Sequence, residues 1–196
     1  PRAMAVWLMA LVLVAASACG RREQAPATSA EPVVSGPRVV SLVPAVTEML
    51  FAVGAGPQVV GVSSYDKHPA EVATRTRVGA LLDPDLEKIL ALKPALVVSY
   101  GSQTTLHEQL QRVGIEVMPY RHGGIGETLA TMEEVGRRTG HEAQGREAAQ
   151  VLRAQLTGIR MRVEGQPRPA ALLVFGREPG AIRQVWASGG VGFLHE

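Results

Sequence analysis

The chain has 196 residues, room for one ordinary domain or slightly more, and its 46% hydrophobic and 19% charged residues favour a packed core over disorder. The net charge is only +2 and no Lys/Arg cluster exceeds a doublet, which argues against nucleic-acid binding. The single cysteine excludes a disulfide framework and a CxxC-type metal site.

The N-terminal segment predicts export from the cytoplasm. Residues 4–18 are almost continuously apolar (MAVWLMALVLVAASA), too short for the ~20 residues of a membrane-spanning helix. Arg2 precedes this run and small residues end it, which is typical of a signal peptide over residues 1–18. The sequence ASAC ending at Cys19 resembles a bacterial lipobox, although it lacks the usual leucine at position 16. It predicts lipidation of Cys19, with ordinary cleavage after Ala18 as the alternative.

Residues 19–37 are interpreted as the anchor cysteine followed by a flexible tether. The stretch GRREQAPATSAEPVVSGP is rich in Pro, Ala, Ser, Thr and charged residues, a composition that does not form a core. An anchor and a tether together predict a domain held at a membrane surface outside the cytoplasm.

From residue 38 onward, short apolar runs alternate with helical patterns. Continuous apolar strands separated by helices are typical of an α/β domain with a parallel sheet buried on both faces. The expected elements are strand 38–43, helix 47–53, strand 59–63, helix 83–92, strand 95–99, helix 106–113 and strand 115–118.

The helix expected at 83–92 has the clearest start signals. Asp83 can cap it, Pro84 suits its first turn, and Asp85 and Glu87 favour the positive end of the helix dipole. It should end before Pro94.

Residues 125–166 are predicted to be mostly helical, with a break at Gly140. Apolar residues from Ala148 to Val163 recur at three-, four- and seven-residue spacings, which predicts one helix over 141–163, about 34 Å long. Such a helix is long for a crossover and could bridge two lobes. Strands are expected over 170–175 and 184–187.

All three tyrosines follow predicted strands. Tyr65, Tyr100 and Tyr120 come after the strands that end near residues 63, 99 and 118. Ligands of open α/β sheets bind at that edge, and tyrosine offers a flat apolar face with a hydroxyl. The coincidence of three favours a ligand-binding rim, with packing at the sheet edge as the alternative for each.

Catalytic signals are weak. The five histidines show no HExxH spacing, and the chain has neither a GxSxG elbow nor a Walker A loop. His107 and His141 are expected to be solvated. His68 and His122 lie just beyond Tyr65 and Tyr120, so a metal-dependent envelope enzyme that uses them with Asp66 is a distant alternative. No catalytic residue, metal ligand or cofactor is assigned.

Four stretches carry a family resemblance: RVVSLVPAVTEMLFAVG at 38–54, VGVSSYD at 60–66, VG at 78–79 and PDLEKILALKPALVV at 84–98. They closely resemble the substrate-binding proteins of ABC importers for vitamin B12, haem and ferric siderophores. The resemblance implies two Rossmann-like α/β lobes joined by a long helix, with the ligand between them. It also implies an ABC permease as partner and, with the leader, a lipid-anchored position in the cell envelope.

The resemblance suggests roles for individual residues. Tyr65 matches an aromatic residue of the corrinoid pocket and Tyr100 matches a second one. Leu81 falls where B12-binding members can carry tryptophan, so that contact would be weaker here. Glu87 matches the glutamate that docks onto a permease arginine, and its alternative role is to stabilise the helix dipole.

A corrinoid is the ligand that the resemblance favours. The SSYD and PDLE stretches are most similar to the cobalamin-binding branch. Haem-binding members tend to carry a tyrosine where this chain has Ala80, which counts against haem. A ferric siderophore is the alternative, since such pockets often contain arginine and Arg121 lies near the predicted edge.

The domain plan expected from these observations has an N-terminal ligand-binding lobe over 38–124 and helices over 125–166. Residues 167–196 would supply only the start of a second, incomplete lobe, so the chain is expected to be truncated. The apolar residues from Leu172 to Phe175 should then be exposed, and the 196-residue chain should bind ligand poorly.

Overall fold

The computed structural model describes residues 35–180 and 183–188. The predicted signal peptide and Cys19 lie outside these residues, as do most of the predicted tether and the last eight residues of the chain. None of the described helices is both long and apolar enough to cross a membrane.

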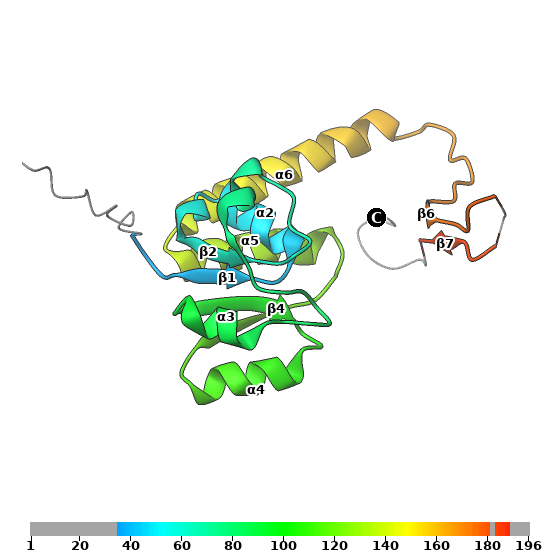
Figure 1. Ribbon diagram of the computed structural model, residues 1–196. Coiled ribbons are helices and arrows are strands. Elements are labelled where there is room, and N and C mark those ends of the chain that lie inside the picture. Colours follow the sequence, from blue (N-terminus) through cyan, green and yellow to red (C-terminus); the bar gives the residue numbers. More distant parts are fainter. Residues whose placement is uncertain (1–34, 181–182, 189–196) are drawn as a thin grey trace, which may run out of the picture. The chain divides into compact units, whose positions relative to one another are not determined.

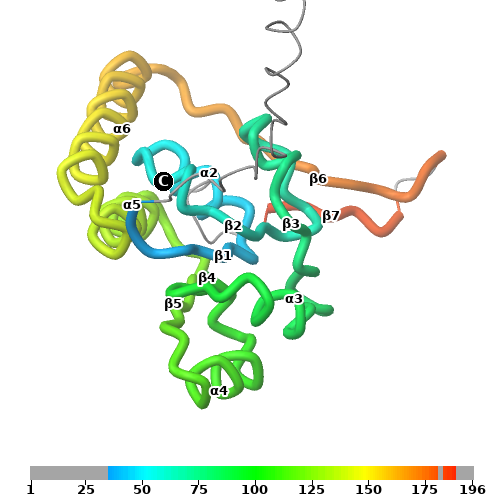
Figure 2. The backbone as a smooth tube through the Cα atoms, turned by 60° about the vertical axis from the view of Figure 1, so that its left-hand side comes forward, coloured from blue at the N-terminus to red at the C-terminus, as the bar shows by residue number. Residues whose placement is uncertain are grey.

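Five parallel strands form the central sheet, in the order β3-β2-β1-β4-β5. Figure 2 shows β1 in the middle, with β2 and β3 on one side and β4 and β5 on the other. The strands are β1 Val39–Ser41, β2 Val59–Val62, β3 Thr76–Arg77, β4 Leu96–Tyr100 and β5 Glu116–Tyr120. Strands β2 and β3 lie on one side of β1 and strands β4 and β5 on the other, so the strand order reverses between β1 and β4.

Helices cover both faces of this sheet (Figure 1). Because successive strand residues point to opposite faces, Val39 packs with α2 and α5 while its neighbour Val40 packs with α3 and α4. Both valines are fully buried, as the continuous apolar run predicts. The helices are α2 Pro44–Ala52, α3 Leu86–Ala91, α4 Thr104–Arg112, α5 Ile125–Thr139 and α6 Glu142–Val163.

Three helix starts differ from the sequence-based prediction by two or three residues, and one of them is that of α4, which begins at Thr104 rather than at residue 106. Helix α2 begins at Pro44 rather than Thr47, because proline fits the first turn, where its missing N–H needs no partner. Helix α3 begins at Leu86, and Asp85 caps it by accepting a hydrogen bond from the Lys88 amide. The prediction of Asp83 as the cap is therefore wrong.

Strand β5 extends two residues beyond its predicted end and includes Pro119. Proline is tolerated there because β5 lies at the edge of the sheet. At the opposite edge lies β3, a two-residue strand of polar side chains that was not predicted from the sequence. The short 3-10 helices at Gly56–Gln58 and Ala70–Thr74 were not predicted either.

Helices α5 and α6 pack closely against each other. The predicted break at Gly140 is confirmed, and this residue ends α5 with a φ of 77°. Gly136 and Gly145 lie at the contact, where a β-carbon on Gly136 would come within 2.9 Å of the Gly145 Cα. The two glycines thus let the helix backbones approach each other.

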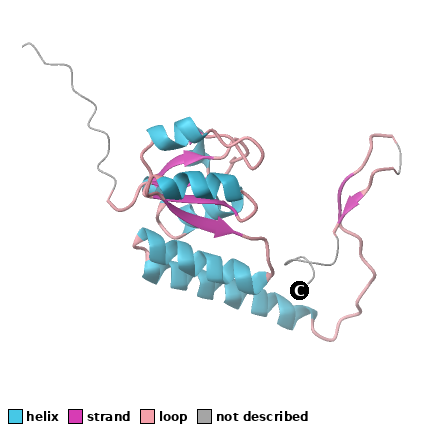
Figure 3. Ribbon diagram, turned by 90° about the horizontal axis from the view of Figure 1, so that it is seen from below, coloured by secondary structure: helices cyan, strands magenta, loops and turns pink. Residues whose placement is uncertain are grey.

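The second half of α6 is mostly exposed. The buried residues of the whole helix are Gly145 and Ala149, and both lie in its first half. In the second half Ile159, Met161 and Val163 are exposed. Figure 3 shows the helix continuing past the strands. The predicted single helix over 141–163 is confirmed to within one residue.

Beyond α6, two strands form an antiparallel pair: β6 Val174–Gly176 and β7 Trp186–Ala187. Both are shorter than the strands predicted over 170–175 and 184–187. Leu172 and Phe175 are 70% and 67% exposed, as expected for this apolar stretch. The predicted α/β class with a parallel sheet is confirmed.

Candidate functional site

The carboxyl edge of the sheet carries the candidate site. In open α/β sheets ligands bind where the strand order reverses, which here is between the carboxyl ends of β1 and β4. Tyr100 and Tyr120 are the last residues of β4 and β5 and are direct partners in the ladder. Their rings pack edge to face with centroids 6.2 Å apart. The sequence placed both just after their strands, and the structure makes them the final strand residues.

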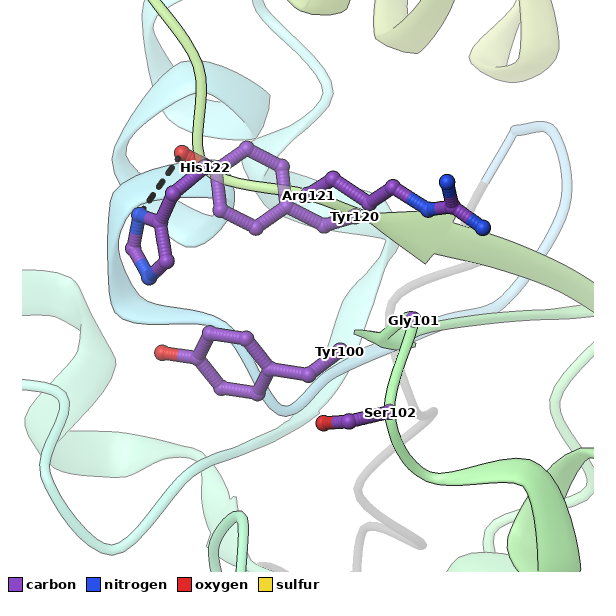
Figure 4. A pocket seen from close by; sticks show the side chains of 6 residues that line it. All are labelled: Tyr100, Gly101, Ser102, Tyr120, Arg121 and His122. Atoms are coloured by element: carbon purple, nitrogen blue, oxygen red, sulfur yellow. Dashed lines mark hydrogen bonds between the residues drawn. The ribbon is translucent and has the colours of Figure 1, made fainter. Parts of the chain in front are cut away.

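An open pocket of about 400 Å³ lies at this edge (Figure 4). The His122 ring completes an aromatic cluster, with its centroid 5.2 Å from that of Tyr120 and 5.8 Å from that of Tyr100. Figure 4 shows both tyrosine hydroxyls on the same side as His122, whereas the Arg121 guanidinium points the opposite way. The lining residues are Tyr100, Gly101, Ser102, Tyr120, Arg121 and His122.

Partial burial makes the two phenols harder to ionise. Desolvation raises the pKa of Tyr100 above its ordinary value, with smaller contributions from Tyr120 and Asp66, and desolvation also raises the pKa of Tyr120. Both hydroxyls therefore carry their protons at neutral pH. The cluster offers flat apolar faces with neutral hydrogen-bonding groups on one side and a cation on the other.

Tyr65 lies on a separate turn and does not line this pocket. It is 72% exposed, and its backbone N–H donates to Ser63 Oγ at 3.2 Å. The Ser64 amide donates to the Gly79 carbonyl, which brings the Tyr65 turn beside the loop after β3. Arg77 fixes the turn further by donating to the carbonyls of Ser63 and Asp66, both at 2.8 Å.

Leu81 and Glu87 also lie outside the pocket. Leu81 is 41% exposed and belongs to the loop between β3 and α3. Its carbonyl accepts a hydrogen bond from Gln103 Nε2 at 3.0 Å, and the Gln103 Oε1 accepts one from the Tyr100 amide at 3.0 Å. Glu87 is an exposed residue in the first turn of α3. Its proposed contact with a permease stays a prediction.

Asp66 is a buried acid next to the Tyr65 turn. It is 3% exposed, and neither carboxylate oxygen has a hydrogen-bond partner among the described residues. Desolvation is the largest effect on this carboxyl and raises its pKa above the ordinary value, against a smaller opposing effect of the Arg77 cation. Burial thus favours the protonated acid.

The structure gives no support to a metal site. Among residues 35–180 and 183–188, no three His, Cys, Asp or Glu side chains gather where they could hold an ion, so Asp66, His68 and His122 do not form the set considered from the sequence. The expectation that His107 and His141 are solvated is wrong. Both are half-buried, with His107 Nε2 bonded to the buried Ser99 Oγ at 2.8 Å and His141 Nδ1 3.0 Å from the Thr139 carbonyl.

Ser102 and Gln103 were not identified from the sequence. Ser102 carries no sequence signal apart from its nearness to Tyr100, and the pocket identifies it as a lining residue. Gln103 did carry a weak signal, because it precedes a helix at the position that Ser, Thr, Asp or Asn usually occupy as a cap.

Comparison with known proteins places this architecture in a family. The sequence model described as "Periplasmic binding protein" matches residues 39–195. A vitamin B12-binding protein of Salmonella typhimurium is 33% identical over 147 residues, covering 74% of this chain and 54% of its own length. A vitamin B12-binding protein of Yersinia pestis is 29% identical over 181 residues, with 91% and 59% covered. The chain thus spans a little over half the length of these relatives.

Solved structures share the fold. The periplasmic vitamin B12-binding protein of Vibrio cholerae aligns with a TM-score of 0.65 at 23% identity, over 72% of this chain and 56% of its own. A periplasmic heme-binding protein of Pseudomonas aeruginosa aligns with a TM-score of 0.66 at 24% identity, over 79% and 57%. Since the family model covers most of the sequence, the chain belongs to the periplasmic binding protein family.

Proposed function

We propose that this chain is the ligand-capturing part of the substrate-binding component of an ABC importer, and that its ligand is a corrinoid such as vitamin B12. The observation that carries the proposal is the pair of tyrosines at the carboxyl ends of β4 and β5, in a chain 33% identical to a protein named for vitamin B12 binding. The proposal concerns binding and delivery, not catalysis.

The chemistry of the pocket suits a large ring with polar substituents. The exposed parts of Tyr100 and Tyr120 offer apolar faces, and their neutral hydroxyls can bond amide side chains on a corrin ring. Arg121 can bond carbonyl oxygens at the other end of the pocket. The pocket is open, which is consistent with a ligand covered on its other side by further protein.

A ferric siderophore is the second candidate, ahead of haem. Arg121 at the pocket favours an anionic chelate, and similar folds include a heme-binding protein. Against haem, Ala80 takes the place of the tyrosine expected in haem-binding members and is 3% exposed, so it supplies no ligand to iron.

The remaining parts of the proposal concern delivery. Glu87 would dock onto a basic residue of the permease, and lipidation of Cys19 would hold the protein on the outer face of the membrane. The exposure of Glu87 at the start of α3 is compatible with such a contact.

Calorimetric titration of the natural full-length protein with cyanocobalamin, hemin and a ferric siderophore tests the ligand. We expect saturable heat with cyanocobalamin and an affinity loss of at least about tenfold for Tyr100→Ala, since central aromatic residues dominate binding energy. The matched control is Val113→Ala, an exposed apolar residue at the end of α4, which should bind normally. Saturable heat with hemin or siderophore alone would replace the corrinoid, and no binding to any of the three would refute the proposed function.

A further inference from the structure

Gln103 makes a tertiary connection that its position in the sequence does not explain. It immediately precedes α4 and is 8% exposed. Its Oε1 accepts from the Tyr100 amide and its Nε2 donates to the Leu81 carbonyl, both at 3.0 Å. Because a backbone N–H can only donate and a carbonyl can only accept, a single orientation of the side-chain amide satisfies both bonds.

The side chain does this instead of capping its own helix. The residue before a helix usually accepts a hydrogen bond from a backbone N–H of the first turn, and Gln103 makes no such bond. Its bond to the Leu81 carbonyl connects its own segment to one that lies 22 residues earlier in the chain. Its position therefore favours a role in holding those segments together over a role in starting α4.

The segment it holds is the loop of residues 79–85. Backbone hydrogen bonds fix the two ends of this loop, through Ser64 N to the Gly79 carbonyl and Asp85 N to the Val78 carbonyl. Between these ends, the bond from Gln103 ties Leu81. The loop exposes two large apolar side chains, with Leu81 41% and Leu82 93% exposed.

We infer that Gln103 is a positioning residue for the proposed ligand, which holds the apolar loop of Leu81 and Leu82 in place relative to Tyr100. The inference rests on the proposed function and adds Leu82 to the ligand-binding surface. A loop that is already ordered before the ligand binds loses no further conformational entropy on binding. The connection therefore raises affinity without Gln103 touching the ligand.

Gln103→Glu tests this through its pH dependence. An ionised glutamate can still accept from Tyr100 but cannot donate to Leu81, whereas the protonated acid can do both. Burial raises the pKa of such a glutamate, so about pH 7.5 and about pH 4 bracket the change. We expect cyanocobalamin binding about tenfold weaker than wild type at the higher pH, because the Leu81 carbonyl loses its partner, and near-wild-type binding at the lower pH.

Two variants separate positioning from general effects of charge or acid. Gln109→Glu places the same charge on the exposed face of α4 and should match wild type at both pH values. Gln103→Leu cannot make either bond and should stay weak at both. Hydrogen exchange of amides 79–83, measured without ligand, should be faster than wild type in Gln103→Glu only at the higher pH.

The outcomes distinguish this inference from the proposed function. If wild type binds none of the three ligands, the proposed function fails, and the exchange data alone decide whether Gln103 holds the loop. If wild type binds but Gln103→Glu matches it at about pH 7.5, or is equally weak at both pH values, the positioning role is overturned.

Discussion

Neighbouring side chains at the carboxyl edge of the sheet differ sharply in how exposed they are. Tyr65 and Leu82 stand in solvent, while Asp66, one residue from Tyr65, is 3% exposed and has no hydrogen-bond partner for its carboxylate among the described residues. Unpaired buried acids cost stability when ionised. The residue is thus expected to weaken the fold rather than support it.

Asp66→Asn should reveal that cost through its pH dependence. The folded-state pKa of Asp66 is raised, so the folded protein binds more protons than the unfolded chain between the ordinary value of 3.8 and the raised one. Wild-type stability therefore falls as the pH rises through this window, and the asparagine variant lacks that loss. The free energy of unfolding of Asp66→Asn minus that of wild type should increase with pH above 3.8 and then level off.

Urea denaturation from about pH 3 to pH 8 measures this difference. Asp83→Asn is the control, because it makes the same substitution at an exposed aspartate. A difference for Asp66→Asn that does not change with pH would contradict the assignment of Asp66 as a destabilising buried acid.

At the scale of elements, the start of α3 tests which aspartate caps the helix. Asp85→Ala should lower the thermal midpoint, since it removes the bond to the Lys88 amide. Asp83→Ala should leave the thermal midpoint nearly unchanged. Equal losses for the two variants in a thermal melt would mean that the cap is not at Asp85.

The close contact between α5 and α6 depends on glycine. Two alanine substitutions, one at the contact and one away from it, test this dependence. A β-carbon on Gly136 would lie 2.7 Å from the His141 carbonyl oxygen, so Gly136→Ala should cost about 1–3 kcal/mol despite the better helix propensity of alanine. Gly158, in α6, has no neighbouring atom within 4 Å of such a carbon, so Gly158→Ala should stabilise the protein by up to about 1 kcal/mol. Denaturant unfolding of both variants checks the opposite signs.

Elements that depend on nearby residues were predictable from the sequence, whereas elements that depend on contacts with distant residues were not. The break at Gly140 was predictable because a left-handed residue there needs glycine, and the buried strands were predictable from their apolar runs. Strand β3 was not, since Thr76 and Arg77 are strand residues only through pairing with β2. Tyr100 and Tyr120 could be assigned to the edge from their place after strands, whereas Gln103 acts through a loop 22 residues away.

At the scale of the whole molecule, the proposed delivery step predicts an effect of charge at Glu87. Glu87→Lys should slow cobalamin transfer about tenfold in proteoliposomes that carry the cognate permease, and the effect should shrink as salt is added. Glu108→Lys, which reverses an exposed charge on α4, should transfer at the wild-type rate. Ligand affinity in solution should be unchanged in both variants, and an equal transfer defect in both would argue against docking through Glu87.

The strand order also has a consequence for how the protein assembles. The paired strands β1 and β2 are close in sequence, with one helical connection between them, and so are β4 and β5. Strands β1 and β4 are far apart in sequence, because their pairing joins Val39 to Leu96. Bringing such distant segments together is slow because the chain between them loses entropy before the contact forms. We therefore expect two half-sheets to form early and to join late along the β1–β4 seam. The pocket at the carboxyl ends of β4 and β5 lies within one half-sheet, so it would form before the β1–β4 seam closes.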